Sequence, residues 1–158
     1  MADIACTYSL STPAGTINLN LGTLKDGTDK YWVQNVTGLD GPSIRAPVDN
    51  VPFGDGGLVY NFWMGPRHIV FEGVLVTESV GFPSFGDDCI TVQNGMEDDL
   101  RTALDSILRA DGTLSWTPLG LGARSLTVQY EQSLECSAAE NYAIKQFVFG
   151  LIAGNPNW

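Results

Sequence analysis

The chain is poor in positive charge. Of its 158 residues only 8 are Lys or Arg, against 18 Asp or Glu, so the formal net charge is −10. Phosphate contacts with nucleic acid need clustered Lys and Arg, and an amphipathic helix needs a basic face to bind an anionic membrane. We therefore expect neither specific nucleic-acid binding nor attachment to a membrane surface.

Long apolar runs are also missing. No uninterrupted apolar stretch approaches the roughly 18 residues of a membrane-spanning helix. The N-terminal letters MADIACTYSL lack the basic start and the apolar centre of a secretion signal. The sequence therefore predicts a protein that is made in a cytoplasm and has no membrane partner.

The residues that usually perform catalysis or bind metal are few. The three cysteines, Cys6, Cys89 and Cys136, are odd in number and show no CxxC spacing, which favours buried thiols over disulfides or a zinc site. His68 is the only histidine, and no nucleophile, zinc-protease or phosphate-binding loop motif accompanies it. We assign no catalytic, cofactor-binding or metal-binding residue, and we expect a protein that is not an enzyme.

Two sets of carboxylates are candidates for a catalytic or a cation site. Glu72 and Glu78 lie six residues apart on an expected strand, which is about 20 Å and too far for a glycosidase pair. Acidic residues also cluster near the start of an expected helix, where the helix dipole favours negative charge: Asp87, Asp88, Glu97, Asp98 and Asp99. Their spacing matches no calcium loop, and whether they bind a cation stays open.

Most of the chain has the pattern of strands separated by glycine-containing turns. Glycine occurs 18 times, well above its usual share. Alternating or β-branched segments predict strands at 16–22, 30–39, 58–64, 68–79, 112–118, 123–138 and 141–158. Turn signals at Asp26–Gly27 and at Gly65–Pro66 predict that the first two strands and the next two strands form hairpins.

One segment has the period of a helix. Between residues 94 and 112 the apolar side chains recur every three or four residues, at Met96, Leu100, Ala103, Leu104, Ile107 and Leu108. We place the helix at about 95–110, with Glu97, Asp98 and Asp99 in its first turn and Arg109 in its last. The predicted fold is mainly β with one helix (α+β): a single domain, residues 1–158, built as an antiparallel β-barrel or sandwich with one flanking α-helix.

A long segment without helical or strand period separates the second and third expected strands. Residues 40–57 contain three prolines and four glycines, and loops of this length are usually functional. Charged residues make up only 16% of the chain, which is compatible with surfaces that are covered by other copies. The candidate subunit-interface residues come from this loop and the aromatic strand after it: Ile44, Val48, Val51, Phe53, Tyr60, Phe62 and Trp63.

Four stretches, taken in order, resemble a known family. They are YWVQNVTGLDGP (31–42), IRAPVDNVPFGDGGLVY (44–60), RHIVFEGVL (67–75), and LRADGTLSW (108–116) followed by FVFGLIAGNPNW (147–158). In this order they are similar to the distal tail proteins of phages with long non-contractile tails, also called minor tail or siphovirus tail component proteins. None of the stretches is a catalytic motif.

The resemblance implies an architecture and a set of partners. Family members have a barrel core with one flanking helix, related to that of tail tube proteins, and form a hexameric ring at the distal end of the tail tube. The ring would contact the tube protein on one side and the tail tip or baseplate hub on the other, and DNA would pass through its lumen without specific binding. The implied location is the virion, and the six-fold symmetry rests on the resemblance alone.

Two alternative functions stay open. The chain could be a tail tube subunit, which stacks into many rings. It could instead be a carbohydrate- or receptor-binding β-sandwich, with Trp32, Trp63, Trp116 and Trp158 as stacking platforms. Longer family members append a carbohydrate-binding domain; because the sequence ends at Trp158, we expect no such domain here.

Overall fold

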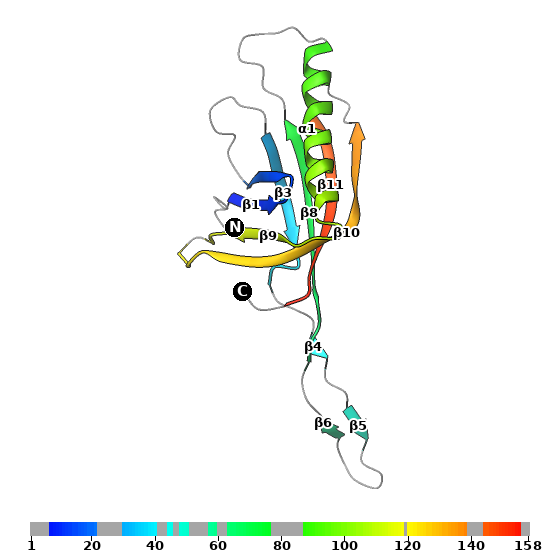
Figure 1. Cartoon of the computed structure of the whole chain (residues 1–158). Helices are drawn as coiled ribbons and strands as arrows, with labels where there is room; N and C mark the ends of the chain where they lie inside the picture. Colours follow the sequence, from blue (N-terminus) through cyan, green and yellow to red (C-terminus); the bar gives the residue numbers. More distant parts are fainter. Residues whose placement is uncertain are drawn as a thin grey trace.

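The main body of the protein is a closed barrel of seven strands (Figure 1). The structure, a computed structural model, describes residues 7–21, 30–40, 44–45, 48–50, 57–59, 63–76, 87–118, 120–138 and 144–155. Around the barrel the strands follow in the order β1 (Thr7–Thr12), β2 (Gly15–Leu21), β3 (Lys30–Thr37), β8 (Arg67–Val76), β11 (Ile144–Ala153), β10 (Arg124–Ala138) and β9 (Gly112–Trp116). The expected class, mainly β with one helix, is confirmed. Of the two expected forms, barrel or sandwich, the structure has the barrel.

Alternation of side chains gives the barrel its interior. Along β8 the residues Ile69 and Phe71 are buried, whereas His68 before them and Glu72 after them are exposed. On the neighbouring strand, Phe149 stacks on Phe71 with ring centroids 5.2 Å apart. The core cluster contains the inward-facing apolar residues of all seven strands, so one continuous core fills the barrel.

The first hairpin lies earlier in the chain than expected. β1, which the pattern analysis missed, pairs with β2 through a turn at residues 13–14, and the Thr12 hydroxyl donates to the Gly15 carbonyl at 2.8 Å. The strands β2 and β3, which were expected to form an antiparallel hairpin, pair in parallel. The hairpin prediction was wrong, because a turn signal predicts a change of direction but not which strands pair. Residues 26–27 themselves lie outside the described residues.

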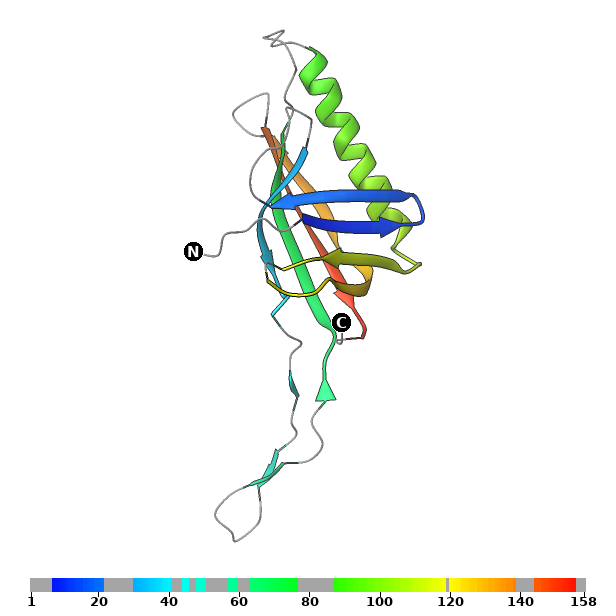
Figure 2. The same ribbon diagram turned by 90° about the vertical axis from the view of Figure 1, so that its left-hand side faces the viewer.

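The segment between β3 and β8 forms a narrow extension from one end of the barrel (Figures 1 and 2). It contains two small antiparallel sheets, one of β4 (Ile44–Arg45) and β7 (Trp63–Met64), the other of β5 (Val48–Asn50) and β6 (Gly57–Val59). We call these four strands the arm. The expected hairpin of 58–64 with 68–79 was wrong, because β7 pairs with β4, and Gly65–Pro66 connects β7 to β8 without reversing the chain. Residues 58–59 and 63–64 of the expected strand are in β6 and β7, and residues 60–62 lie outside the described residues.

The helix is longer at its start and shorter at its end than predicted. α1 (Asp87–Ser106) begins about two turns before residue 95 and ends before Arg109. Glu97, Asp98 and Asp99 therefore lie in the middle of the helix, and the last turn holds no basic residue. The helix closes with bonds from the Ile107 and Leu108 amides to carbonyls three residues earlier.

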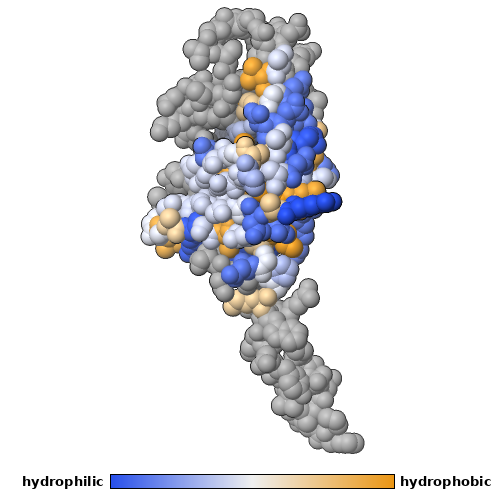
Figure 3. Space-filling model, viewed as in Figure 1, coloured by the Kyte–Doolittle hydropathy of each residue, from blue (hydrophilic) through white to orange (hydrophobic). Residues whose placement is uncertain are grey.

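One face of α1 packs on the barrel. Met96, Leu100, Ala103, Leu104 and the following Ile107 are buried, which confirms most of the predicted apolar stripe. Leu108, the last member of that stripe, is 55% exposed because the helix has already ended. Figure 3 shows hydrophilic side chains along the outward side of the helix. Within the described residues, no helix is long and apolar enough to cross a membrane.

Candidate subunit interface

The structure brings the two predicted interface segments together in the arm. β4 carries Ile44, β5 carries Val48 and β7 carries Trp63. The other four predicted residues, Val51, Phe53, Tyr60 and Phe62, lie outside the described residues. Because β4 pairs with β7 and β5 with β6, the described candidate residues of the loop and of the aromatic strand lie on one extension.

Backbone pairing within the arm is short. Val48 lies opposite Val59 in the outer sheet, and Ile44 lies opposite Met64 in the inner one. Each of the two sheets has only two strands, so among the described residues the outer edges of all four strands have no ladder partner. An isolated two-stranded ribbon is marginally stable in water, and open strand edges are sites where a further chain can add.

Two polar pairs lie on the outer surface of the barrel. The His68 ring nitrogen Nδ1 and the Glu131 carboxylate are 2.7 Å apart, and the His68 side chain is 57% exposed. The Asn35 amide donates to the Glu72 carboxylate at 3.2 Å. The only histidine thus has a carboxylate partner in an exposed pair, and the Glu72 carboxylate is bound to an amide. Glu78 lies outside the described residues.

An ion pair that the sequence did not predict ties the helix to the barrel. Glu97 on α1 contacts Lys145 on β11, and on its own helix Arg101 donates to it at 2.9 Å. The hydrogen bond from Lys145 is the main reason why the pKa of Glu97 lies below its ordinary value. Since 48 residues separate the two partners along the chain, no local pattern could have revealed this contact.

Burial perturbs two further groups beside the helix. The Tyr31 hydroxyl donates to the Met96 carbonyl at 2.8 Å, and burial, with a smaller contribution from the charge of Asp99, raises the pKa of Tyr31 to about 12. Burial also raises the pKa of the Cys136 thiol to about 11, with a smaller effect of the Glu97 charge. The raised pKa values keep both groups uncharged well above neutral pH, and both side chains pack against the core cluster.

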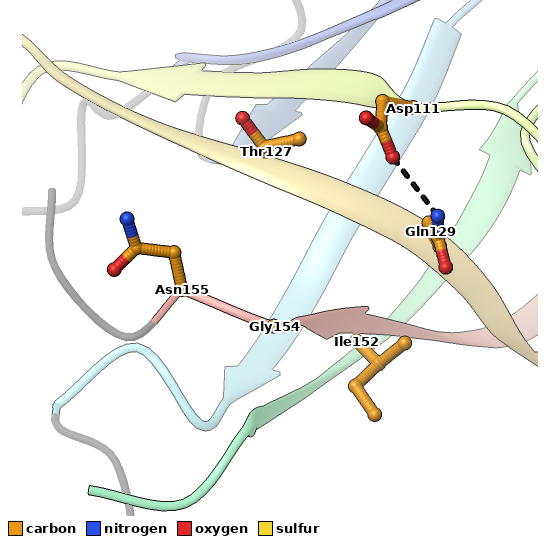
Figure 4. Close-up of a pocket in the computed structure, with 6 residues that line it drawn as sticks. All are labelled: Asp111, Thr127, Gln129, Ile152, Gly154 and Asn155. Carbon is orange, nitrogen blue, oxygen red and sulfur yellow. Dashed lines mark hydrogen bonds between the residues drawn. The ribbon is translucent and has the colours of Figure 1, made fainter.

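A shallow pocket lies on the outer surface where β9, β10 and β11 meet (Figure 4). Its volume is about 420 Å³, and it is lined by Asp111, Thr127, Gln129, Ile152, Gly154 and Asn155. The Gln129 amide donates to the Asp111 carboxylate at 2.9 Å. The lining offers hydrogen bonds from a carboxylate, a hydroxyl and amides and includes no basic side chain, so it does not have the chemistry of an anion site.

The tryptophans that could serve as sugar-stacking platforms lie in different environments. Of the four tryptophans considered as sugar platforms, Trp116 belongs to the core at 5% exposure and cannot stack on a ligand; Trp32 is partly buried, and Trp158 lies outside the described residues. Among the residues that the structure describes, no group of three His, Cys, Asp or Glu side chains could hold a metal ion.

Taken together, the barrel, its helix and the arm define a class: a small β-barrel protein with one helix on the barrel and a long two-stranded extension from one end. No protein-family model and no curated protein sequence matches the chain. The crystal structure of SPP1 Dit, described as a paradigm of the hub adsorption apparatus in phages that infect Gram-positive bacteria, matches with a TM-score of 0.55 and 11% identity. The match covers 94% of this chain and 50% of that one, so the chain spans about half the length of SPP1 Dit. At this identity the likeness establishes a shared fold.

Proposed function

We propose that the protein is a structural component of a phage tail, and specifically a distal tail protein that forms a ring at the end of the tail tube. The observation that carries this proposal is the fold shared with SPP1 Dit over 94% of the chain. The order of the four stretches that resemble distal tail proteins also supports it.

A closed ring needs two different surfaces on each subunit, since every copy meets one neighbour on each side. The arm supplies one of them: its two-residue and three-residue ladders have open edges and too few strands to be stable without further packing. We propose that the arm packs on a second copy, and that Ile44, Val48 and Trp63 lie in that contact. The six copies of the ring would then be joined by the arms.

The partners follow from the position of such a ring. The tail tube protein would bind one face of the ring, and the tail tip or hub proteins the other. DNA would pass through the lumen. The net charge of −10 per chain suits this passage, because a lumen with the same sign of charge as phosphate does not retain DNA.

The solution mass of the purified chain tests the proposal. We expect a discrete particle of six times the monomer mass in mass photometry, and a ring in negative-stain images. A matched variant replaces residues 41–62 by a short Gly–Ser linker, which the barrel can accommodate because Thr37 and Val70 already lie opposite each other on β3 and β8. This variant should keep the cooperative thermal transition of the barrel and sediment as a monomer.

Other results would point elsewhere. Open-ended polymers of the full chain would support a tail tube subunit. Binding of the isolated protein to a glycan array would support a receptor-binding module. A full-length chain that stays a monomer at high concentration, in the presence of tail tube protein, would contradict the proposed ring.

A further inference from the structure

The arm leaves the barrel beside β8. Its outgoing leg follows β3, which pairs with β8, and its returning leg continues into β8 itself. β3 ends at Thr37, opposite Val70 on β8, and β8 begins at Arg67, opposite Ala153 on β11. β8 is therefore paired with β3 down to Val70 and with β11 down to Arg67, at the base of the arm. The residues at this base lie in two of the stretches that resemble distal tail proteins, 31–42 and 67–75.

On the outgoing leg, Gly38 lies directly against the backbone of β8. Its φ angle is +86°, a conformation that residues with a side chain rarely adopt. A Cβ atom at this position would overlap the carbonyl oxygen of His68 and lie 2.8 Å from its carbonyl carbon and 3.2 Å from the Cα of Ile69. All three atoms are backbone, so the contact cannot be relieved by rotating a side chain, and only glycine allows the leg to leave at this distance.

On the returning leg, Arg67 ties the two legs together. Its side chain is only 2% exposed, and its Nη1 donates to the carbonyl oxygen of Leu39 at 3.0 Å. Burial, with a smaller effect from the charge of Arg124, lowers the pKa of the guanidinium. The side chain of Leu39 packs on the core. A buried arginine is costly unless it forms hydrogen bonds, and here a charge-assisted bond joins the start of β8 to the residue that follows Gly38.

We infer that Gly38, Leu39 and Arg67 form a fixed junction that sets the direction in which the arm leaves the barrel. The arm then leaves the barrel in one fixed direction, and its own short ladders gain further packing only on a partner. Because the partner surface is met in a single geometry, less orientational freedom is lost on association. The value of this orientation for ring assembly rests on the proposed function, whereas the junction itself does not.

A distance measurement between arm and barrel tests the junction. Spin labels are placed near the base of the arm on β7 and on β2, at the exposed positions Met64→Cys and Asn18→Cys, in a background where the three native cysteines are serine. Labelled chain is diluted into unlabelled chain so that only distances within one copy are recorded. The wild-type junction should give one narrow distance distribution, and a broad distribution would overturn the inference.

Two variants and a matched control locate the cause. Gly38→Ala should shift or broaden the distribution, and Arg67→Met should broaden it. Gly120→Ala is the control, because Gly120 also has a positive φ, +74°, but no atom lies within 4 Å of an added Cβ; it should leave the distribution unchanged. A wild-type distribution in a folded Gly38→Ala or Arg67→Met protein would overturn the inference. If both variants fail to fold, the wild-type distance distribution alone tests the inference: a narrow distribution supports the fixed junction and a broad one overturns it.

The same samples separate the junction from the proposed function. A narrow distribution in a protein that remains a monomer would retain the junction and reject the ring. Rings formed by chains with a broad distribution would reject the junction and retain the ring. We expect a narrow distribution together with rings, and Gly38→Ala should lower the fraction of closed rings at least tenfold at equal concentration.

Discussion

Replacing Leu104 by alanine tests where the helix ends and how α1 is held. Leu104 is fully buried in the core cluster, whereas Leu108, one turn later, is 55% exposed. Both residues belong to the same apolar stripe of the sequence, so a pattern argument treats them alike. The structure separates them, because α1 ends at Ser106 and the chain after Ile107 turns away from the core.

The magnitude follows from burial. Removing a fully buried leucine side chain costs about 2–5 kcal/mol of unfolding free energy. In a domain of this size 1 kcal/mol corresponds to about 2–4 °C, so Leu104→Ala should lower Tm by about 4–20 °C. Leu108→Ala should change the unfolding free energy by less than about 0.5 kcal/mol. Thermal unfolding followed by circular dichroism measures both, and equal losses in the two variants would refute the assigned end of the helix.

Four further predictions concern packing, charge and thiol reactivity. Gly95→Ala should stabilise the protein by about 0.5–1 kcal/mol in urea unfolding, because Gly95 lies inside α1 with open space around it. Gly73→Ala should destabilise it by about 1–3 kcal/mol, since an added Cβ would lie 2.3 Å from the Trp32 carbonyl oxygen on β3 and 2.7 Å from the Phe147 ring on β11; a Gly73→Ala protein of unchanged stability would contradict the packing of β8 between β3 and β11. Glu97→Gln should lose stability at neutral pH but match the wild type at about pH 2. The reason is that Lys145 lowers the folded-state pKa of Glu97, so its contribution is full above the unfolded-state pKa and disappears as the pH falls through the folded value; a loss that persists at low pH would count against this. The Cys136 thiol, with its pKa raised to about 11, should be alkylated about 100-fold more slowly at pH 8 in the folded protein than after unfolding in urea, and equal rates in peptide mapping would show that it is not buried as described.

The elements that were predicted well have a strong local signal. β10 and β11 alternate buried and exposed residues, and α1 has a continuous apolar stripe. Such periodicity is imposed by burial of one face, so it is visible without knowledge of the partners. The start of α1 was missed because its first two turns contain Ile90, Thr91 and Val92, β-branched residues with low intrinsic helix propensity.

The errors concern which strands meet. The residues of β2 and β3 have strand character, but the parallel pairing of Leu19 with Tyr31 depends on the closure of the barrel. The prolines and glycines between β3 and β8 indicated a loop, whereas the strands β4 to β7 pair across it as an arm. Ladders of two or three residues are too short to show the alternation of a strand within a segment rich in proline and glycine.

What the sequence determined by itself is the class of the fold: short alternating strands, one amphipathic helix and a surface with little positive charge. These follow from composition and from the periodicity of single segments. Only the tertiary structure decided how the barrel closes and that the arm is one extension. It also decided that, at the base of the arm, Gly38 lies against the backbone of His68 and Arg67 donates to the Leu39 carbonyl. The physical reason is that backbone pairing and close approach depend on residues far apart in the chain, and no local pattern records which distant segment will supply the partner.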